Sequence, residues 1–98
     1  MVAENIIGTI TSDGCVVVKV YPHLQDRLDD RDISSADVMD ALQNPLHITD
    51  DRTGTATGEV SRQYIGQYAT VAYNPNNRSA VTAWRTGSRY IKKYGGDS

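Results

Sequence analysis

The sequence predicts one α+β domain in which an N-terminal hairpin and two short helices pack on one face of an antiparallel sheet of about four strands. Apolar residues recur at helical spacing between positions 22 and 43, whereas β-branched and aromatic runs follow from about position 59 to position 94. The chain has 98 residues, of which 39% are hydrophobic, and this suffices for one modest core. We therefore expect residues 1–98 to form a single domain.

The hairpin is expected over residues 5–20. β-branched runs lie on either side of Asp13-Gly14, a dipeptide that favours tight turns. Cys15, the one cysteine of the chain, lies in an apolar run. A lone cysteine in such a run is more often a buried small hydrophobe than a nucleophile.

Two helices are expected, over about 22–31 and 35–43. Pro22 suits the first turn of the first helix, and Leu24 with Leu28 gives it an apolar stripe. The second helix can be capped by Ser34 or Ser35. It should end before the Asn-Pro pair at positions 44–45.

The second half of the chain is predicted to form the sheet. After an irregular stretch at 49–58, antiparallel strands are expected over 60–65, 69–73 and 80–86. The Asn-Pro-Asn-Asn segment at 74–77 predicts a turn, because asparagine tolerates positive φ. The pattern of 88–94 fits a last strand or a short helical turn, and does not decide between them.

Charge is distributed unevenly although the net charge is only −2. Between positions 26 and 51 the charged residues are Asp26, Arg27, Asp29, Asp30, Arg31, Asp32, Asp37, Asp40, Asp50 and Asp51. From position 60 to position 96 they are all basic: Arg62, Arg78, Arg85, Arg89, Lys92 and Lys93. Such asymmetry predicts a cationic face that can meet phosphates, although scattered solvated charges would give the same sequence.

Common catalytic and cofactor signatures are absent from the sequence. It has no Gly-rich phosphate loop, no Cys/His cluster and no serine nucleophile elbow. The Asp29-Asp30 and Asp50-Asp51 pairs lack the spacing of a calcium loop. We therefore expect no cofactor and no metal. The sequence also has no apolar run long enough to span a membrane, so no membrane partner is expected.

His23, Arg27 and Arg31 follow one another at intervals of four residues, which places them near one stripe of the first helix. Metal-free RNA cleavage needs a base, an acid and a cation or donor near the phosphate. Histidine titrates near neutral pH and can act as base or acid, although a histidine at a helix start is structural at least as often. The arginines can equally pair with carboxylates of the same helix.

A second candidate cluster lies in the strand at 80–86. Alternation places Thr82, Trp84 and Thr86 on one face, and Ala83 and Arg85 on the other. If Trp84 faces a ligand, its ring can stack on an unpaired base. If it faces the core, it is the largest packing residue of a chain without phenylalanine. Tyr90 and other tyrosines are interleaved with basic residues. Each of these rings could likewise stack on an unpaired base or pack in the core.

Short motifs over about three-quarters of the chain resemble a known family. From His23 the sequence reads His-x3-Arg-x3-Arg-x-Ile-Ser, and it continues through Asp37-Val38, Ala41-Leu42 and Asn44-Pro45. Arg62-x-Tyr64-x-Gly66 and Thr82-x-Trp84-x-Thr86 follow. This pattern is similar to small ribonuclease toxin domains of the barnase, EndoU, colicin and RelE group. Such domains occur at the C-termini of polymorphic and contact-dependent inhibition toxins and of some phage head proteins.

The resemblance implies a metal-independent endoribonuclease toxin that cleaves RNA, with tRNA as the foremost target. His23 would be the acid/base, Arg27 and Thr82 would position or stabilise the phosphate, and Trp84 would stack a base. Further substrate-binding candidates are Arg31, Arg62, Arg85, Thr86, Tyr90, Lys92 and Lys93. The toxin would act in the cytoplasm, either free-standing or delivered as part of a larger secreted protein, and a cognate immunity protein or antitoxin would be its partner.

Two other functions fit the same sequence. An immunity protein or antitoxin would use its acidic helical half to cover the cationic cleft of a nuclease. A phage adaptor domain would keep the fold without activity.

Overall fold

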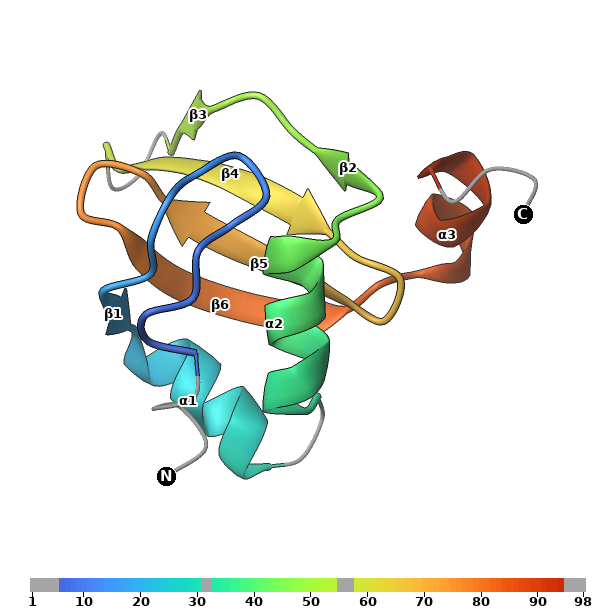
Figure 1. Cartoon of the computed structure of the whole chain (residues 1–98), viewed down its shortest axis with the longest axis horizontal. Coiled ribbons are helices and arrows are strands. Elements are labelled where there is room, and N and C mark those ends of the chain that lie inside the picture. The colour runs from blue at the N-terminus through green and yellow to red at the C-terminus, as the bar shows by residue number, and fades with distance from the viewer. Residues whose placement is uncertain (1–5, 31–32, 55–57, 95–98) are drawn as a thin grey trace.

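A six-stranded mixed sheet is the central element of the fold, in a computed structural model that describes residues 6–30, 33–54 and 58–94 (Figure 1). The elements in chain order are β1 (Lys19–Val20), α1 (Pro22–Asp29), α2 (Ser35–Gln43), β2 (His47–Ile48), β3 (Arg52–Thr53), β4 (Val60–Ile65), β5 (Ala69–Asn74), β6 (Ser79–Arg85) and α3 (Ser88–Tyr94). The predicted α+β class is confirmed.

The strand order is β1-β6-β5-β4-β2, and β3 also pairs with β4. The long strands β4, β5 and β6 form an antiparallel meander with nearly the predicted bounds. The sheet has more strands than predicted, and β1 runs parallel to β6. The additional strands β1, β2 and β3 have two residues each, which is too short for a readable alternation of side chains.

The two N-terminal helices cover one face of this sheet. Leu24 and Leu28 of α1 and Leu42 of α2 are buried in the same cluster as Val71 and Ala83 of the strands. In Figure 1, α2 and the N-terminal segment lie in front of the sheet, and α3 stands apart at one end. The helices therefore leave the opposite face of the meander for solvent or a ligand.

The helix bounds follow from their capping residues. The Ser34 hydroxyl accepts a hydrogen bond from the Asp37 N–H at 3.1 Å, so α2 begins at the predicted residue. Helix α1 begins at Pro22 as predicted but ends at Asp29, two residues before the expected end. Position 31 lies outside the described residues.

The predicted N-terminal hairpin is present as a short bridge over residues 6–18; its expected first residue, 5, lies outside the described part. Ile10 pairs with Val16 in antiparallel fashion, and the Gly8 N–H donates to the Val17 carbonyl at 2.7 Å. Gly14 takes a φ of 88° in the turn, as glycine does at little cost. The Ser12 N–H donates to the Leu42 carbonyl at 2.9 Å, which ties the hairpin to α2.

The predicted turn at 74–77 is present, but positive φ falls on Arg78, with a value of 56°, rather than on an asparagine. The Asn74 side chain instead accepts hydrogen bonds from the Asn76 and Asn77 N–H groups. The tail 88–94 forms helix α3, which resolves the choice that the sequence left open. None of the helices in the described ranges is long and apolar enough to cross a membrane.

Candidate functional site

The face of the meander opposite α1 and α2 carries polar side chains and a tryptophan. Tyr64, Val71 and Ala83 are register partners and are buried under the helices. Because side chains alternate along a strand, the adjacent rows point the other way. These rows are Gln63, Ala72 and Thr82, and then Ile65, Thr70 and Trp84. We call this the open face.

Trp84 belongs to the open face and not to the main core. Its neighbour Ala83 is fully buried under the helices, whereas Trp84 is partly exposed. Thr82, two residues earlier, is also partly exposed. The structure therefore places Thr82 and Trp84 side by side on a surface that a ligand can reach.

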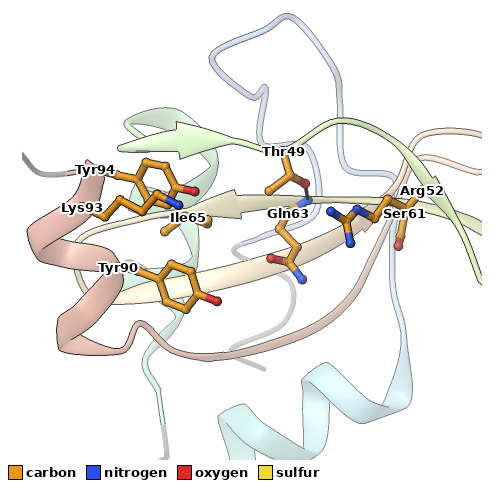
Figure 2. A pocket seen from close by; sticks show the side chains of 8 residues that line it. All are labelled: Thr49, Arg52, Ser61, Gln63, Ile65, Tyr90, Lys93 and Tyr94. Carbon is orange, nitrogen blue, oxygen red and sulfur yellow. Dashed lines mark hydrogen bonds between the residues drawn. The ribbon is translucent and has the colours of Figure 1, made fainter.

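A hollow of about 360 Å³ adjoins the open face along β4, between β3 and α3. Its lining residues are Thr49, Arg52, Ser61, Gln63, Ile65, Tyr90, Lys93 and Tyr94. Figure 2 shows the Tyr90 and Tyr94 hydroxyls pointing into the hollow from α3, with Arg52 at its opposite end. We call this hollow the groove.

The groove is rich in hydrogen-bond donors and carries positive charge. Arg52 and Lys93 supply cations, and hydroxyls and the Gln63 amide supply neutral donors. None of the described lining residues has a carboxylate, in a chain whose net charge is −2. Such a lining suits an extended anion better than a cation or an apolar ligand.

Aromatic contacts hold α3 against β2 at the end of the groove. The ring of Tyr94 stacks on His47 with centroids 4.2 Å apart and planes within 5°. Tyr90 lies parallel to Tyr94 at 6.2 Å, and the Lys93 Nζ lies 5.2 Å from the centre of the Tyr94 ring. These contacts keep the rings of His47, Tyr94 and Tyr90 parallel, with the Lys93 ammonium group beside them, at the end of the groove.

A second hollow of about 370 Å³ continues the groove on the side of β2. Its lining adds His47, Ile48, Asp50 and Asp51 to three residues that both hollows share: Thr49, Arg52 and Tyr94. A ligand that extends from the groove into this second hollow would lie next to His47.

The predicted acid/base, His23, lies elsewhere. It is exposed in the first turn of α1, the helix that packs against the face of β6 opposite Thr82 and Trp84. No hydrogen bond, ion pair or ring contact of the described residues joins His23 to Thr82 or Trp84. Arg27 is exposed on the same helix, and Arg31 lies outside the described residues. The structure thus does not bring the predicted catalytic residues together.

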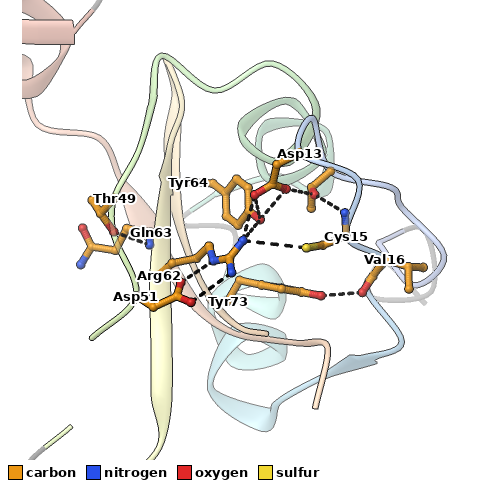
Figure 3. Close-up of polar contacts among 10 residues, drawn as sticks. Asp13, Cys15, Val16, Thr49, Asp51, Arg62, Gln63, Tyr64 and Tyr73 are labelled. Carbon is orange, nitrogen blue, oxygen red and sulfur yellow. Dashed lines mark hydrogen bonds and ion pairs between the residues drawn. The ribbon is translucent and has the colours of Figure 1, made fainter. Parts of the chain in front are cut away.

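Arg62, a predicted RNA contact, is engaged by two carboxylates (Figure 3). Its Nη1 lies 2.9 Å from Asp13, and its Nε lies 2.7 Å from Asp51. The Tyr64 hydroxyl donates to the same Asp13 at 2.8 Å, and the Thr11 hydroxyl also donates to it. We call these five residues the Arg62 cluster. It joins the hairpin, β4 and the β2–β3 loop on the covered side of the sheet.

The contacts within the Arg62 cluster favour the ionised form of the Asp13 carboxyl group. Burial acts to raise the pKa of Asp13, but the Thr11 and Tyr64 hydrogen bonds and the Arg62 charge outweigh it and lower the pKa below 3.8. Burial, helped by the adjacent Asp13, raises the pKa of Tyr64. The hydrogen bond to Asp51 raises the pKa of Arg62 further above its already high value. The cluster is therefore a fixed ion network at neutral pH.

The remaining predicted RNA contacts are dispersed. Thr86 is buried, and its hydroxyl donates to the Gly66 carbonyl at 2.7 Å and lies 2.9 Å from the Thr70 hydroxyl. Arg85 and Lys92 are exposed but do not line the groove. Only Tyr90 and Lys93 of this set do so.

Sequence reasoning missed Arg52, Gln63 and His47. The polar residues Ser61 and Gln63, two positions apart in β4, were a readable sign of a partly polar strand face. Arg52 and His47 lie in strands of two residues, and no sequence pattern points to their position.

No protein-family model, no curated protein and no solved structure matches this chain.

Proposed function

We propose that this chain is a metal-independent endoribonuclease toxin that binds an unpaired stretch of RNA, foremost of tRNA, on the open face. One observation carries the proposal. A donor-rich groove with two cations and no described carboxylate lies on the same sheet face as the partly exposed Trp84. The toxin would act in the cytoplasm, either free-standing or after delivery within a larger secreted protein.

The two parts of this surface match the two parts of a nucleotide. Phosphates are recognised by cations and hydrogen-bond donors, which Arg52, Lys93 and the tyrosine hydroxyls supply. Unpaired bases stack on aromatic side chains, and Trp84 offers such a ring two strands away from the groove floor. Single-stranded RNA presents both features at once, whereas in duplexes the bases are already stacked.

Cleavage would follow the usual chemistry of metal-free ribonucleases. The RNA 2′-hydroxyl loses its proton to a base and attacks the adjacent phosphorus, while an acid protonates the leaving 5′-oxygen. Cations at the groove would stabilise the extra charge on the phosphate. The assignment of the acid/base to His23 comes from the family resemblance and stays a prediction.

The test is binding and cleavage of single-stranded RNA by Arg52→Gln and Lys93→Gln in EDTA. Arg89→Gln is the matched control, because Arg89 is an exposed cation on α3 that does not line the groove. We expect the groove variants to bind more weakly and to reduce the slope of log affinity against log salt by about one unit each. Equal behaviour of all three variants would contradict the proposed binding face. Failure of the folded wild type to cleave any RNA would contradict the proposed activity.

A second candidate function is that of an immunity protein or antitoxin. Exposed carboxylates at Asp26 and Asp29 of α1 and at its C-cap residue Asp30 favour it, because they could meet a cationic nuclease cleft. Expression in bacteria separates the two functions. A ribonuclease arrests growth and fragments RNA, whereas an immunity protein leaves both unchanged and rescues cells from its toxin.

A further inference from the structure

We propose that His47 is the histidine that exchanges protons with RNA in the groove. The inference rests on the proposed ribonuclease function and adds a catalytic residue that neither the sequence motifs nor the resemblance indicate. It is carried by the position of His47 in the second hollow, which shares Thr49, Arg52 and Tyr94 with the groove, and by its stack on Tyr94.

The backbone register places His47 on the open face. His47 pairs with Ile65 of β4 in antiparallel register, and paired residues of neighbouring strands point to the same side. Ile65 lines the groove. His47 is itself exposed, so its imidazole can be reached by a ligand.

The orientation of the His47 ring is restrained from one side. Its parallel stack on Tyr94, with centroids 4.2 Å apart, covers one face of the imidazole. The edges of the ring carry the nitrogen atoms, and a stacked face leaves these edges open. A restrained ring with open nitrogens suits proton transfer better than a freely rotating side chain.

The groups around His47 come from two elements besides its own strand. Asp50, Asp51 and Arg52 share its hollow from the segment after β2, and Tyr94 and Lys93 approach from α3. Asp51 is paired with Arg62, which leaves Asp50 and Arg52 as the charges with no described ion pair there.

The proposed reaction needs no group that the chain lacks. His47 takes the proton of the 2′-hydroxyl while the O2′–P bond forms and the P–O5′ bond breaks. The departing 5′-oxygen takes a proton from Tyr94, Lys93 or water, and the products are a 2′,3′-cyclic phosphate and a 5′-hydroxyl. Arg52 lies in both hollows and would hold the phosphate during these steps.

The experiment compares wild type, His47→Phe and His23→Ala on a fluorescent single-stranded RNA oligonucleotide in EDTA. Phenylalanine keeps a ring to stack on Tyr94 but cannot exchange a proton, so it separates chemistry from docking of α3. We expect His47→Phe to bind RNA within about threefold of wild type and to cleave at least about 100-fold more slowly. The wild-type rate should change with pH between about 5 and 8, and this dependence should be lost in the variant.

The outcomes distinguish this inference from the function on which it rests. Added imidazole should restore part of the activity to His47→Gly, which a purely structural histidine would not allow. If wild type cleaves RNA and His47→Phe cleaves it as fast, the assignment to His47 is wrong and the ribonuclease function stands. If folded wild type cleaves no RNA, the proposed function is wrong, and the role of His47 is wrong with it.

Discussion

The Tyr64 hydroxyl donates a hydrogen bond to Asp13 at 2.8 Å, although the two residues are 51 positions apart in the chain. This contact fastens the N-terminal hairpin to β4 on the covered face of the sheet. Arg62 reaches the same carboxylate, and the Tyr73 hydroxyl adds a 2.7 Å bond to the Val16 carbonyl. The hairpin is thus held by polar contacts of β4 and β5 as well as by the buried Ile6 and Val17.

Stability should fall in acid partly because Asp13 becomes protonated. The folded-state pKa of Asp13 lies below its ordinary 3.8. The group therefore contributes stability that is fully present above the unfolded-state pKa and is lost as pH falls through the lowered folded-state value. Thermal melts of wild type and Asp13→Asn at pH between about 2 and 6 test this. The loss between about pH 4 and pH 2 should be smaller in the variant, and identical profiles would contradict it.

Arg62→Met should lower the free energy of unfolding by about 1–3 kcal/mol, because it leaves Asp13 without its cation and removes a two-pronged contact with Asp51. The Asp51 side chain is 46% exposed, so this part of the contact contributes the smaller share. Arg62→Lys keeps the positive charge but not the forked guanidinium group. Its free energy of unfolding should therefore lie between those of wild type and Arg62→Met. Urea titration measures all three. A loss of RNA affinity at unchanged stability would show that Arg62 meets RNA and not the carboxylates.

Much of the fold could be predicted because its longer elements have a readable period. Helix α2 and strand β4 have the expected bounds, and α2 carries both an apolar pattern at helical spacing and a clear serine cap. The tail forming α3 has only seven residues, too few for the pattern to separate helix from strand. The parallel pairing of β1 with β6 depends on contacts between residues 60 positions apart, such as Lys19 and Ser79, which local patterns do not encode.

Part of the candidate site could be predicted because side chains also alternate regularly along a strand. Strand alternation puts Thr82 and Trp84 on one face, and the burial of Ala83 decides that this face is open. Arg62 carries no local sign of its partners, because Asp51 and Asp13 lie 11 and 49 positions away. Because Arg62 lies in a basic segment, the sequence predicted that it contacts phosphate. In the fold, Arg62 instead contacts the carboxylates of Asp13 and Asp51.

Gly66→Ala should destabilise the protein because α2 packs directly on this glycine. An added Cβ would lie 2.7 Å from the Cα and Cβ of Ala41 and 2.8 Å from the Ala69 carbonyl oxygen. Backbone atoms must shift to relieve such contacts, and we expect a loss of about 1–3 kcal/mol. Gly87→Ala is the control, since its nearest neighbour would be Tyr90 at 3.8 Å. Comparable unfolding midpoints in urea for the two variants would contradict this packing.

Trp84→Ala should weaken RNA binding more than it weakens the fold. Burial of a tryptophan in the main core would make the substitution cost about 3–5 kcal/mol, whereas the partly exposed Trp84 should cost less than about 2 kcal/mol. The loss of one stacked base should lower RNA affinity by about 1–3 kcal/mol, or roughly 5- to 150-fold.

Ala83→Leu gives the matched contrast, because Ala83 is fully buried in the same strand. Overpacking there should destabilise the protein by about 1–3 kcal/mol and leave RNA affinity unchanged in the folded variant. Thermal melts and fluorescence anisotropy with the same RNA measure both quantities. If instead Trp84→Ala melts as low as Ala83→Leu and binds RNA like wild type, the ring packs the protein and does not hold a base.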